Sequence, residues 1–291
     1  MPSLICKKIR IGYFGLEDSF TYLATLRRFG RGYLYKSEPL ISKIFEDIIN
    51  NVIDIAVVPI ENSIGGTVYD TVDEIISDRF FKSNVQIKEE LYFPIILNLL
   101  SKSILSKIQK VYSHPFPIYF CRKWIETNLP EAKVIEVNST SEAAKMASRE
   151  KTSAAIASAA AAKNYGLNLI VKNIGGKESN ITHFFVLSKS PIIPKRKENK
   201  TAIAFSLQHK PGALYIALGT LAKADINLTR IISRPLRGKV GEYKFLVEVE
   251  GIISEPSVQK AIKKLEKHTT WINVISSYPT INGKHAISRC K

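Results

Sequence analysis

The sequence predicts an α/β protein: a main domain with two lobes and a cleft between them, then a small βαββαβ domain. Three observations predict this. Apolar runs of strand length alternate with amphipathic segments over residues 9–174. The run DIAVVPI at 54–60 is apolar enough for a strand buried on both faces. The order of strands and helices changes after residues 191–199. The 291 residues suffice for two domains of the usual ~100–200 residues each.

Local signals support each expected element of the first lobe. The order is a strand at 9–14, helices at 19–29 and 38–51, and the buried run at 54–60. Ser19 is placed to cap the first helix. A further helix is expected from Thr67, whose T-x-x-D spacing to Asp70 resembles a capping box. Extended segments are expected next, within residues 85–100.

The second lobe shows the same alternation of strands and helices. Pro115 and Pro117 fall in the first turn of a helix, where proline is tolerated, and Ser139 with Glu142 has capping-box spacing. Alternation of this kind favours mostly parallel sheets. The expected elements are strands at 111–113, 133–138, 154–158 and 168–174, with helices at 114–129 and 139–150. We expect one lobe of approximately 1–82 with 175–190, and a second of 83–174.

A linker at 191–199, PIIPKRKEN, separates the two domains, because its prolines and charge run disfavour regular structure. After it the order is βαββαβ, which is the ferredoxin-like order. The expected strands are 201–207, 227–234, 242–249 and 271–278, and the helices are 212–224 and 255–267. This second domain therefore spans 200–280 and leaves a tail at 281–291.

Composition limits the class of function. The net charge is +16, but Lys and Arg are spread along the chain and no nucleic-acid-binding motif accompanies them. The simpler interpretation is a solvated basic surface, which also attracts a small anionic substrate. Cys6, Cys121 and Cys290 are too far apart for a disulfide framework or zinc cluster, and we expect no metal. No apolar run spans a bilayer and no signal-peptide core is visible. We expect a cytoplasmic protein without nucleic-acid or membrane partners.

Small polar clusters follow four expected strands, where helices begin and free backbone N–H groups attract anions. They are Gly15–Phe20, Glu61–Ser63, Ser113–His114 and Ser139–Ser141. One such cluster is usually a helix cap, but four together describe a receptor for a small carboxylate or phosphate. The sequence lacks a G-x-G-x-x-G fingerprint, a Walker loop and a nucleophile elbow, so we expect no cofactor.

Several of these segments, in order, resemble the prephenate dehydratases. VPIENS at 58–63 resembles the V-P-I-E-N-S segment of that family, YSHP at 112–115 its Y-S-H-P segment, STSEAA at 139–144 its S-T-x-E-A-A segment, and NITHF at 180–184 its N-x-T-R-F motif. The second domain resembles an ACT regulatory domain, since the stretch from 210 to 235 carries counterparts of the G-A-L and E-S-R-P motifs.

The resemblance implies a periplasmic-binding-protein-like catalytic domain at 1–190 that converts prephenate to phenylpyruvate, water and CO2. It implies feedback control by phenylalanine and homodimers or homotetramers of a monofunctional enzyme. The catalytic residues it implies are Thr182, which would donate to the leaving hydroxyl, Asn62 and Ser113. The substrate-binding residues are Glu61, Ser63, Ser19, Phe20, Thr140, Ser141, His183 and Phe184. The phenylalanine-binding residues are Gly212, Ala213, Leu214, Asn227, Leu228, Ser233, Arg234 and Pro235.

The chain departs from the family pattern at four places. His183 replaces an Arg, Ile232 replaces a Glu, Gly15-Leu16-Glu17-Asp18 replaces Gly-Pro-x-Gly, and Phe116 and Phe120 stand where Gln is frequent. These changes keep two alternatives open. One is an arogenate dehydratase, and the other is a non-catalytic amino-acid-sensing protein of the same fold.

The pair Thr182–His183 stands at the polar start of an apolar run. Successive side chains of a strand point to opposite faces. If Thr182 faces the cleft, Phe184 shares its side and His183 supports the strand from the other face, where it keeps a hydrogen bond or a positive charge. If Thr182 instead lies at an irregular strand end, the alternation fails and His183 could meet the substrate.

Overall fold

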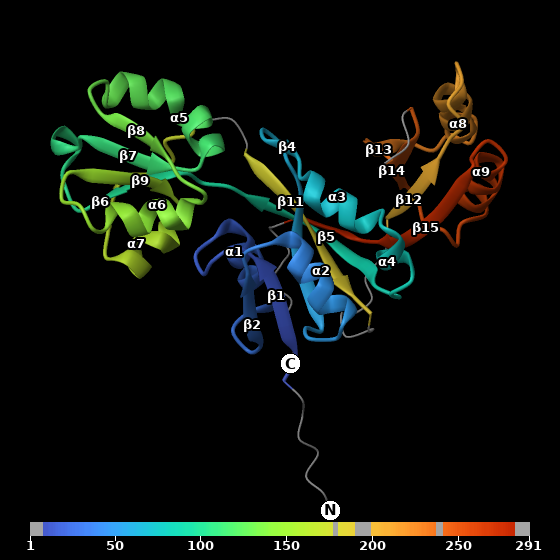
Figure 1. Ribbon diagram of the computed structural model, residues 1–291, viewed down its shortest axis with the longest axis horizontal. Coiled ribbons are helices and arrows are strands. Elements are labelled where there is room, and N and C mark those ends of the chain that lie inside the picture. Colours follow the sequence, from blue (N-terminus) through green and yellow to red (C-terminus); the bar gives the residue numbers. More distant parts are fainter. Residues whose placement is uncertain (1–7, 177–179, 190–198, 237–240, 283–291) are drawn as a thin grey trace, which may run out of the picture.

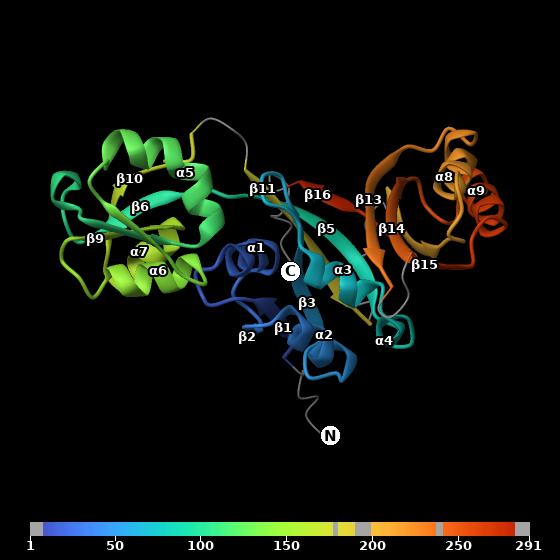
Figure 2. The ribbon, with the colours of Figure 1, turned by 45° about the horizontal axis from the view of Figure 1, so that its top comes forward.

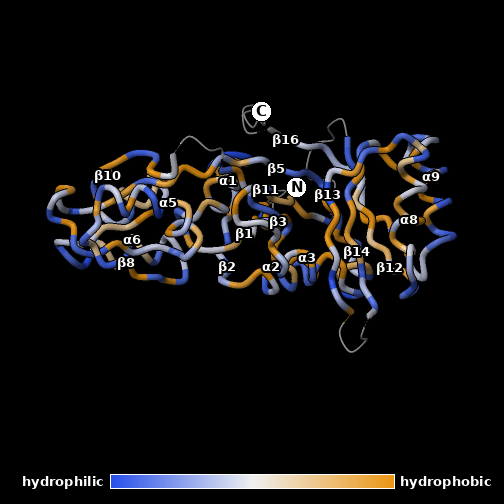
Figure 3. The backbone as a smooth tube through the Cα atoms, turned by 90° about the horizontal axis from the view of Figure 1, so that it is seen from above, coloured by the Kyte–Doolittle hydropathy of each residue, from blue (hydrophilic) through white to orange (hydrophobic). Residues whose placement is uncertain are grey.

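Three α/β units lie in a row in the computed structural model, which describes residues 8–176, 180–189, 199–236 and 241–282 (Figure 1). The second lobe lies at one end, the first lobe in the middle and the C-terminal domain at the other end (Figure 1). Hydrophobic residues follow the strands of all three units (Figure 3). The expected α/β class, the two lobes and the βαββαβ order of the C-terminal domain are confirmed. The expected linker lies, apart from Asn199, outside the described residues.

The first lobe is built on a sheet of strand order β16-β5-β11-β3-β1-β2, with β4 paired to β3. Its strands are β1 (Arg10–Phe14), β2 (Leu34–Glu38), β3 (Ile55–Asn62), β4 (Gly66–Thr67), β5 (Gln86–Pro94), β11 (Ile181–Ser188) and β16 (Thr280–Asn282). Its helices are α1 (Phe20–Phe29), α2 (Ile41–Ile49), α3 (Tyr69–Ile75) and α4 (Asp78–Phe81). Apolar side chains cover both faces of the sheet, one against α1 and the other against α2 and α3.

The second lobe is built on a sheet of order β10-β6-β9-β7-β8. Its strands are β6 (Asn98–Ser101), β7 (Lys110–Ser113), β8 (Lys133–Glu136), β9 (Ser153–Ala157) and β10 (Asn168–Val171). Its helices are the 3-10 turn η1 (Leu105–Lys107), α5 (Pro115–Asn128), α6 (Thr140–Ala147) and α7 (Ala159–Tyr165). His114, Ser139 and Ser158 accept backbone hydrogen bonds at the starts of the three α-helices, as the capping signals at 114–115 and 139–142 predict.

Both sheets are mixed, which corrects the expectation of mostly parallel sheets. The chain leaves the first lobe along β5 and returns along β11, so these two strands pair antiparallel. β11 also pairs antiparallel with β3, and β6 pairs antiparallel with β9 and β10. The boundary at 82–83 was therefore wrong, because β5 belongs to the sheet of the first lobe. A strand that crosses between lobes needs no helical crossover, and periodicity alone does not reveal it.

One further strand was not expected, and one expected helix start was wrong. The segment before α2 contains strand β2, which pairs in parallel with β1 although its own pattern is weakly apolar. Thr67 does not cap a helix: it lies in β4 opposite Glu61, and α3 begins at Tyr69 without a side-chain cap. In both cases pairing with another strand overrides the local signal.

The C-terminal domain has the strand order β13-β14-β12-β15 and packs on the first lobe (Figure 2). Its elements are β12 (Lys200–Ser206), α8 (Ala213–Ala222), β13 (Leu228–Pro235), β14 (Tyr243–Glu250), α9 (Pro256–Glu266) and β15 (Trp271–Tyr278). One face of the sheet packs under α8 and α9, and the other shares a core with the first lobe. Ile232 lies in that shared core, only 7% exposed, which gives a physical reason for its apolar character.

β16 extends the connection between the two domains. Residues 280–282 leave the C-terminal domain and pair in parallel with β5 at the edge of the first sheet. The expected tail at 281–291 therefore begins inside a strand, and its remainder lies outside the described residues. Because β16 belongs to the sheet of the first lobe, the C-terminal domain is joined to that lobe by backbone pairing as well as side-chain packing.

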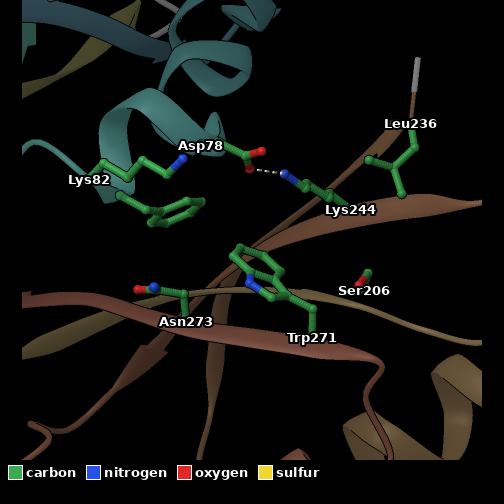
Figure 4. Close-up of a pocket in the computed structure, with 8 residues that line it drawn as sticks. Asp78, Lys82, Ser206, Leu236, Lys244, Trp271 and Asn273 are labelled. Atoms are coloured by element: carbon green, nitrogen blue, oxygen red, sulfur yellow. Dashed lines mark hydrogen bonds and ion pairs between the residues drawn. The ribbon is translucent and has the colours of Figure 1, made fainter. Parts of the chain in front are cut away.

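A hollow of about 520 Å³ interrupts the interface beside α4 (Figure 4). Its floor is Trp271, and the Lys244 ammonium lies 5.0 Å from the centroid of that ring. The same ammonium donates to Asp78 Oδ1 at 3.2 Å and to the Ile76 carbonyl at 3.0 Å. Lys244 thus links the two domains at α4. Within the described ranges, no helix has the length and apolar character needed to cross a membrane.

We predict that Ile232→Glu destabilises the protein strongly, because an unpaired carboxylate enters the shared core. The expected loss is about 3 kcal/mol in the free energy of unfolding, measured by urea denaturation. Thr229→Glu, at an exposed position of the same strand, is the control and should change it by less than about 0.5 kcal/mol. Equal stability of the two variants would contradict the packing described for β13.

Candidate active site

The site lies where the C-terminal end of β3 pairs with the N-terminal end of β11. A bulge in β3 reverses the faces of the sheet to which its last side chains point. His183 pairs with Glu61 and Phe184 pairs with Pro59, so Ile60 is the extra residue. Ile60 is fully buried in the core, and Glu61 points to the same face of the sheet, toward the C-terminal domain. A bulge re-aims the residues that follow it. Asn62 therefore faces the same side as Thr182, its partner in the register.

Asn62 and Thr182 form one hydrogen-bonded unit. Asn62 Oδ1 accepts from the backbone N–H of Ile64 at 3.0 Å and of Gly65 at 2.7 Å. Because backbone N–H groups only donate, these bonds fix the orientation of the amide. Asn62 Nδ2 then donates to Thr182 Oγ1 at 2.9 Å and to Asn180 Oδ1 at 2.7 Å. Thr182 accepts a hydrogen bond, which leaves its own proton available for another acceptor.

Ser63 joins the end of β11 to the turn after β3. Its backbone N–H donates to the Ile181 carbonyl at 2.9 Å, and its Oγ accepts from the Ile181 N–H at 3.0 Å. The Asn180 carbonyl accepts from Ile95 N–H at 2.7 Å, just beyond β5. Thr182 thus lies where the chain passes back from the second lobe into the first, and the segments around it are tied to each other.

The turn before α1 bridges the two lobes through Asp18, a residue that sequence reasoning did not select. Ser141 Oγ, on α6, donates to Asp18 Oδ1, and Ser158 Oγ donates to the Asp18 carbonyl at 2.9 Å. Asp18 is 1% exposed and has φ +78°, a conformation that suits the Gly usual in the family motif. The sequence feature that could have pointed to this contact is the replacement of the family's Gly-Pro-x-Gly by residues 15–18.

Burial raises the pKa of the Asp18 carboxyl above its ordinary value, while hydrogen bonds from Ser141 and Asn164 oppose the rise. Its second oxygen, Oδ2, is buried without a hydrogen-bond partner. Phe20, two residues further along, packs against the core of the second lobe. These contacts hold the first lobe against the second at the start of α1.

The two phenylalanines that replace frequent Gln residues lie on α5, beside the turns that close the site. The Phe116 ring is 58% exposed and approaches Gly65 so closely that an added Cβ would lie 3.6 Å from it. Phe120 packs into the core of the second lobe, and an added Cβ at Gly175 would lie 2.5 Å from its ring. Phe116 therefore lies beside the Asn62 turn, whereas Phe120 belongs to the core of the second lobe.

The remaining residues implied by the family motifs fall into two groups. The first group lies at helix starts. Ser19 precedes α1 and accepts a hydrogen bond from Tyr22 N–H at 3.2 Å. Thr140 is the first residue of α6, whose cap Ser139 accepts from Glu142 N–H at 3.0 Å. Three others have structural partners: Ser113 is fully buried and donates to the Ile156 carbonyl at 2.7 Å, Phe184 lies in the core, and Glu61 pairs with Arg230. Their contact with a substrate stays a prediction.

His183 points away from Thr182, as strand alternation predicts. Its ring stacks on Tyr92 with centroids 4.0 Å apart, and its Nδ1 lies 3.3 Å from Glu90 Oε1 and 3.1 Å from Arg230 Nη2. Burial raises the pKa of Glu90, but the hydrogen bond with His183 and the charges of Arg230 and Lys200 outweigh burial and bring the pKa to about 2. Because Arg230 lies on β13, its contact with His183 joins this residue to the C-terminal domain.

The residues expected to bind an effector surround the start of α8 and the strand β13. Gly212 precedes α8 with φ +76°, Asn227 and Ser233 are exposed, and Leu228 is half-buried. Arg234 instead turns to the first lobe, where it forms a bidentate ion pair with Asp73. Among the described residues, no group of three or more His, Cys, Asp or Glu side chains is arranged to hold a metal ion.

The fold and site define a two-lobed α/β protein with polar side chains where the lobes meet and a small attached βαββαβ domain. The sequence pattern of the prephenate dehydratase family matches residues 11–192, and that of the ACT domain matches 201–267. The chain belongs to the prephenate dehydratase family and carries an ACT domain.

Known proteins of the family resemble nearly the whole chain. A bifunctional chorismate mutase/prephenate dehydratase of Aquifex aeolicus is 40% identical over 94% of this chain and 74% of its own length. A prephenate dehydratase of Methanocaldococcus jannaschii is 37% identical over 82% of this chain and 85% of its own. The crystal structure of prephenate dehydratase from Arthrobacter aurescens in complex with L-Phe superposes with a TM-score of 0.84 at 27% identity, covering 93% of this chain and 90% of that one.

We predict that Asp18→Asn stabilises the protein at pH 7, because the folded state no longer holds a buried carboxylate. A raised pKa means that the folded state binds the proton more tightly, so wild-type stability improves as pH falls toward the unfolded value of about 3.9. The gap in Tm between Asp18→Asn and wild type should close over the same range. Glu131→Gln, at an exposed carboxylate, is the control. A gap that is constant with pH would contradict the raised pKa.

Proposed function

We propose that the Asn62–Thr182 unit is where prephenate undergoes decarboxylating dehydration to phenylpyruvate. One observation carries the proposal: Asn62 donates to Thr182 Oγ1, and its orientation is fixed by Ile64 and Gly65. The Thr182 hydroxyl therefore directs its proton away from Asn62, as a donor held in place before the reaction. A preorganised donor aimed at developing charge is usually the largest catalytic contribution.

The reaction needs such a donor. The bond between the ring and its carboxylate breaks, its electron pair makes the ring aromatic, and the ring hydroxyl departs. The departing oxygen takes up one proton and leaves as water, while the carboxylate leaves as CO2. An aliphatic alcohol is too weak an acid to supply a free proton, so Thr182 stabilises the leaving oxygen by hydrogen bonding and solvent restores the proton balance.

The substrate carries two carboxylates, and the lobes offer backbone donors for them. The start of α6 has free N–H groups beside Thr140, which is only partly buried. The basic net charge of +16 favours the approach of a dianion. Phe116 supplies an aromatic surface to the cleft at a position where the family often has Gln. We infer that this change acts on substrate preference, and an arogenate dehydratase remains the second candidate.

For regulation, we propose that phenylalanine binds where Gly212–Leu214 and Asn227–Leu228 of two ACT domains meet in a homodimer or homotetramer. The L-Phe complex of the Arthrobacter relative supports an effector of this kind. Exposed apolar residues on α8 and β13 support burial against a second copy: Tyr215 at 82%, Ile216 at 43% and Ile231 at 44% exposure. We place this activity in the cytoplasm.

We predict that Thr182→Val lowers kcat for prephenate by about 10²- to 10³-fold with little change in KM, since it removes the donor and keeps the shape. Thr182→Ser keeps the hydroxyl and should lose less than about tenfold. Phenylpyruvate formation is measured without added cofactor, and arogenate is tested in parallel by kcat/KM. If wild-type protein turns over neither substrate yet is stabilised by binding one, the non-catalytic sensing alternative holds.

We predict that calorimetry detects L-phenylalanine binding and that the ligand lowers the rate of phenylpyruvate formation. Leu214→Ala, which removes apolar contact at the proposed effector site, should weaken binding roughly tenfold, or about 1.4 kcal/mol. D-phenylalanine serves as the ligand control. No heat of binding with L-phenylalanine at millimolar concentration would remove the regulatory proposal.

A further inference from the structure

A buried group of charges joins the ACT domain to the back of the active-site strands. We call it the interdomain ion cluster. It consists of Lys200, Arg230 and Glu248 from the ACT domain and Glu61, Glu90 and His183 from the first lobe. Glu90 and Glu248 are fully buried, and charges are retained in such places only when they are paired.

Arg230 is the centre of this cluster. Its side chain is 5% exposed, and its Nη2 lies 2.9 Å from Glu61 Oε2, 3.0 Å from Glu90 Oε1 and 3.1 Å from His183 Nδ1. Its Nη1 donates to Glu248 Oε1. The planar guanidinium thus connects four side chains, three of which belong to the first lobe. Lys200 contributes a second cation, with its ammonium 2.7 Å from Glu90 Oε2.

The residues that Arg230 holds are adjacent to the proposed catalytic pair. Glu61 precedes Asn62 in β3, and His183 follows Thr182 in β11. The two sets form consecutive register pairs, Thr182 with Asn62 and His183 with Glu61. Adjacent strand residues share one backbone but point to opposite faces. A shift of Glu61 or His183 toward or away from Arg230 therefore moves Asn62 and Thr182 on the cleft side.

The bulge at Ile60 makes this support necessary. Bulges interrupt the hydrogen-bonded ladder, so the two strand ends are held less tightly by their own pairing. Arg230 connects Glu61 and His183 across this irregular step, while the Tyr92 ring stacks on His183 and restricts its rotation. The contact is made from β13, the strand that also carries Ser233–Pro235.

We infer that Arg230 is a positioning residue for the reaction: it fixes the separation and aim of Asn62 and Thr182 through Glu61 and His183. The catalytic pair is consequently in place only when the ACT domain is docked on the first lobe. Any displacement of β13, including one caused by an effector, alters catalysis directly. This inference rests on the role proposed for Thr182.

The first test compares Arg230→Lys and Arg230→Gln with the control Lys244→Gln. Lys keeps the charge but not the planar fork. Lys244 ties the same two domains at Asp78 and Ile76, which are not members of the interdomain ion cluster. Both Arg230 variants should lower kcat about 10- to 100-fold with KM within about threefold, because small misplacements of reacting groups are costly. Lys244→Gln should keep wild-type kcat. Wild-type kcat in both Arg230 variants would overturn the inference.

The second test separates positioning from folding. Replacing Arg230 alone leaves the buried Glu248 with only the Lys200 ammonium, 3.7 Å away, as a cationic partner. The double change Arg230→Met with Glu248→Gln therefore removes both charges of the Arg230–Glu248 pair together. The double variant should regain most of the thermal midpoint that Arg230→Met loses, while its kcat stays low. If kcat recovers together with the thermal midpoint, Arg230 is structural only and the inference fails.

The third test asks whether Arg230 acts through the Thr182 hydroxyl. In the Thr182→Val background no hydroxyl remains to be aimed, so Arg230→Lys should cost less than about twofold in residual kcat. A full, additive loss there would show an independent effect and overturn the inference. Failure of the proposed function is recognised separately, because in that case the wild-type protein forms no phenylpyruvate from prephenate.

Discussion

The antiparallel insertion of β11 between β3 and β5 is the contact on which the rest of the structure depends. It closes the path that leaves the first lobe along β5, crosses the second lobe and returns. The same pairing sets Thr182 opposite Asn62, places Phe184 and Val186 against α1, and sends Phe185 and Leu187 into the core shared with the ACT domain. Cleft, core and domain interface thus depend on the register of one strand, and a slip by one residue would exchange its two faces.

Electrostatics makes the docking of the ACT domain specific. Apolar packing alone tolerates sliding, but Glu90 and Glu248 must meet Arg230 and Lys200, because buried carboxylates without partners are strongly destabilising. Burial raises the pKa of Glu90, but the hydrogen bond with His183 and the charges of Arg230 and Lys200 outweigh it and lower the pKa to about 2. Burial raises the pKa of Glu248, which lies deepest in the cluster. The cluster is consequently satisfied in one relative placement of the domains.

The four departures from the family pattern have different physical consequences. His183 remains on the supporting face and contacts charges of both domains. Ile232 fills the shared core, where a carboxylate would be unpaired. Asp18 adopts a left-handed conformation and joins the lobes through Ser141 and Ser158. Phe116 is more than half exposed and lies beside Gly65, so it is the departure most accessible at the Asn62 turn.

Features that depend on neighbours in the chain could be predicted from the sequence: most of the helices and caps, the apolar strands, the order of the domains, the motif residues, and the opposite facing of Thr182 and His183. Tertiary structure decided what depends on distant partners. The pattern of β2 is too weak to predict a strand, yet β1 pairs with it, and β5 is assigned to its lobe by β11. The bulge at Ile60 turns Glu61 toward the ACT domain and Asn62 toward Thr182, and Arg230 reaches Glu61 across 169 positions of sequence. Such contacts exist only once strands far apart in the chain have paired, because the energies that select them belong to the assembled sheet and interface.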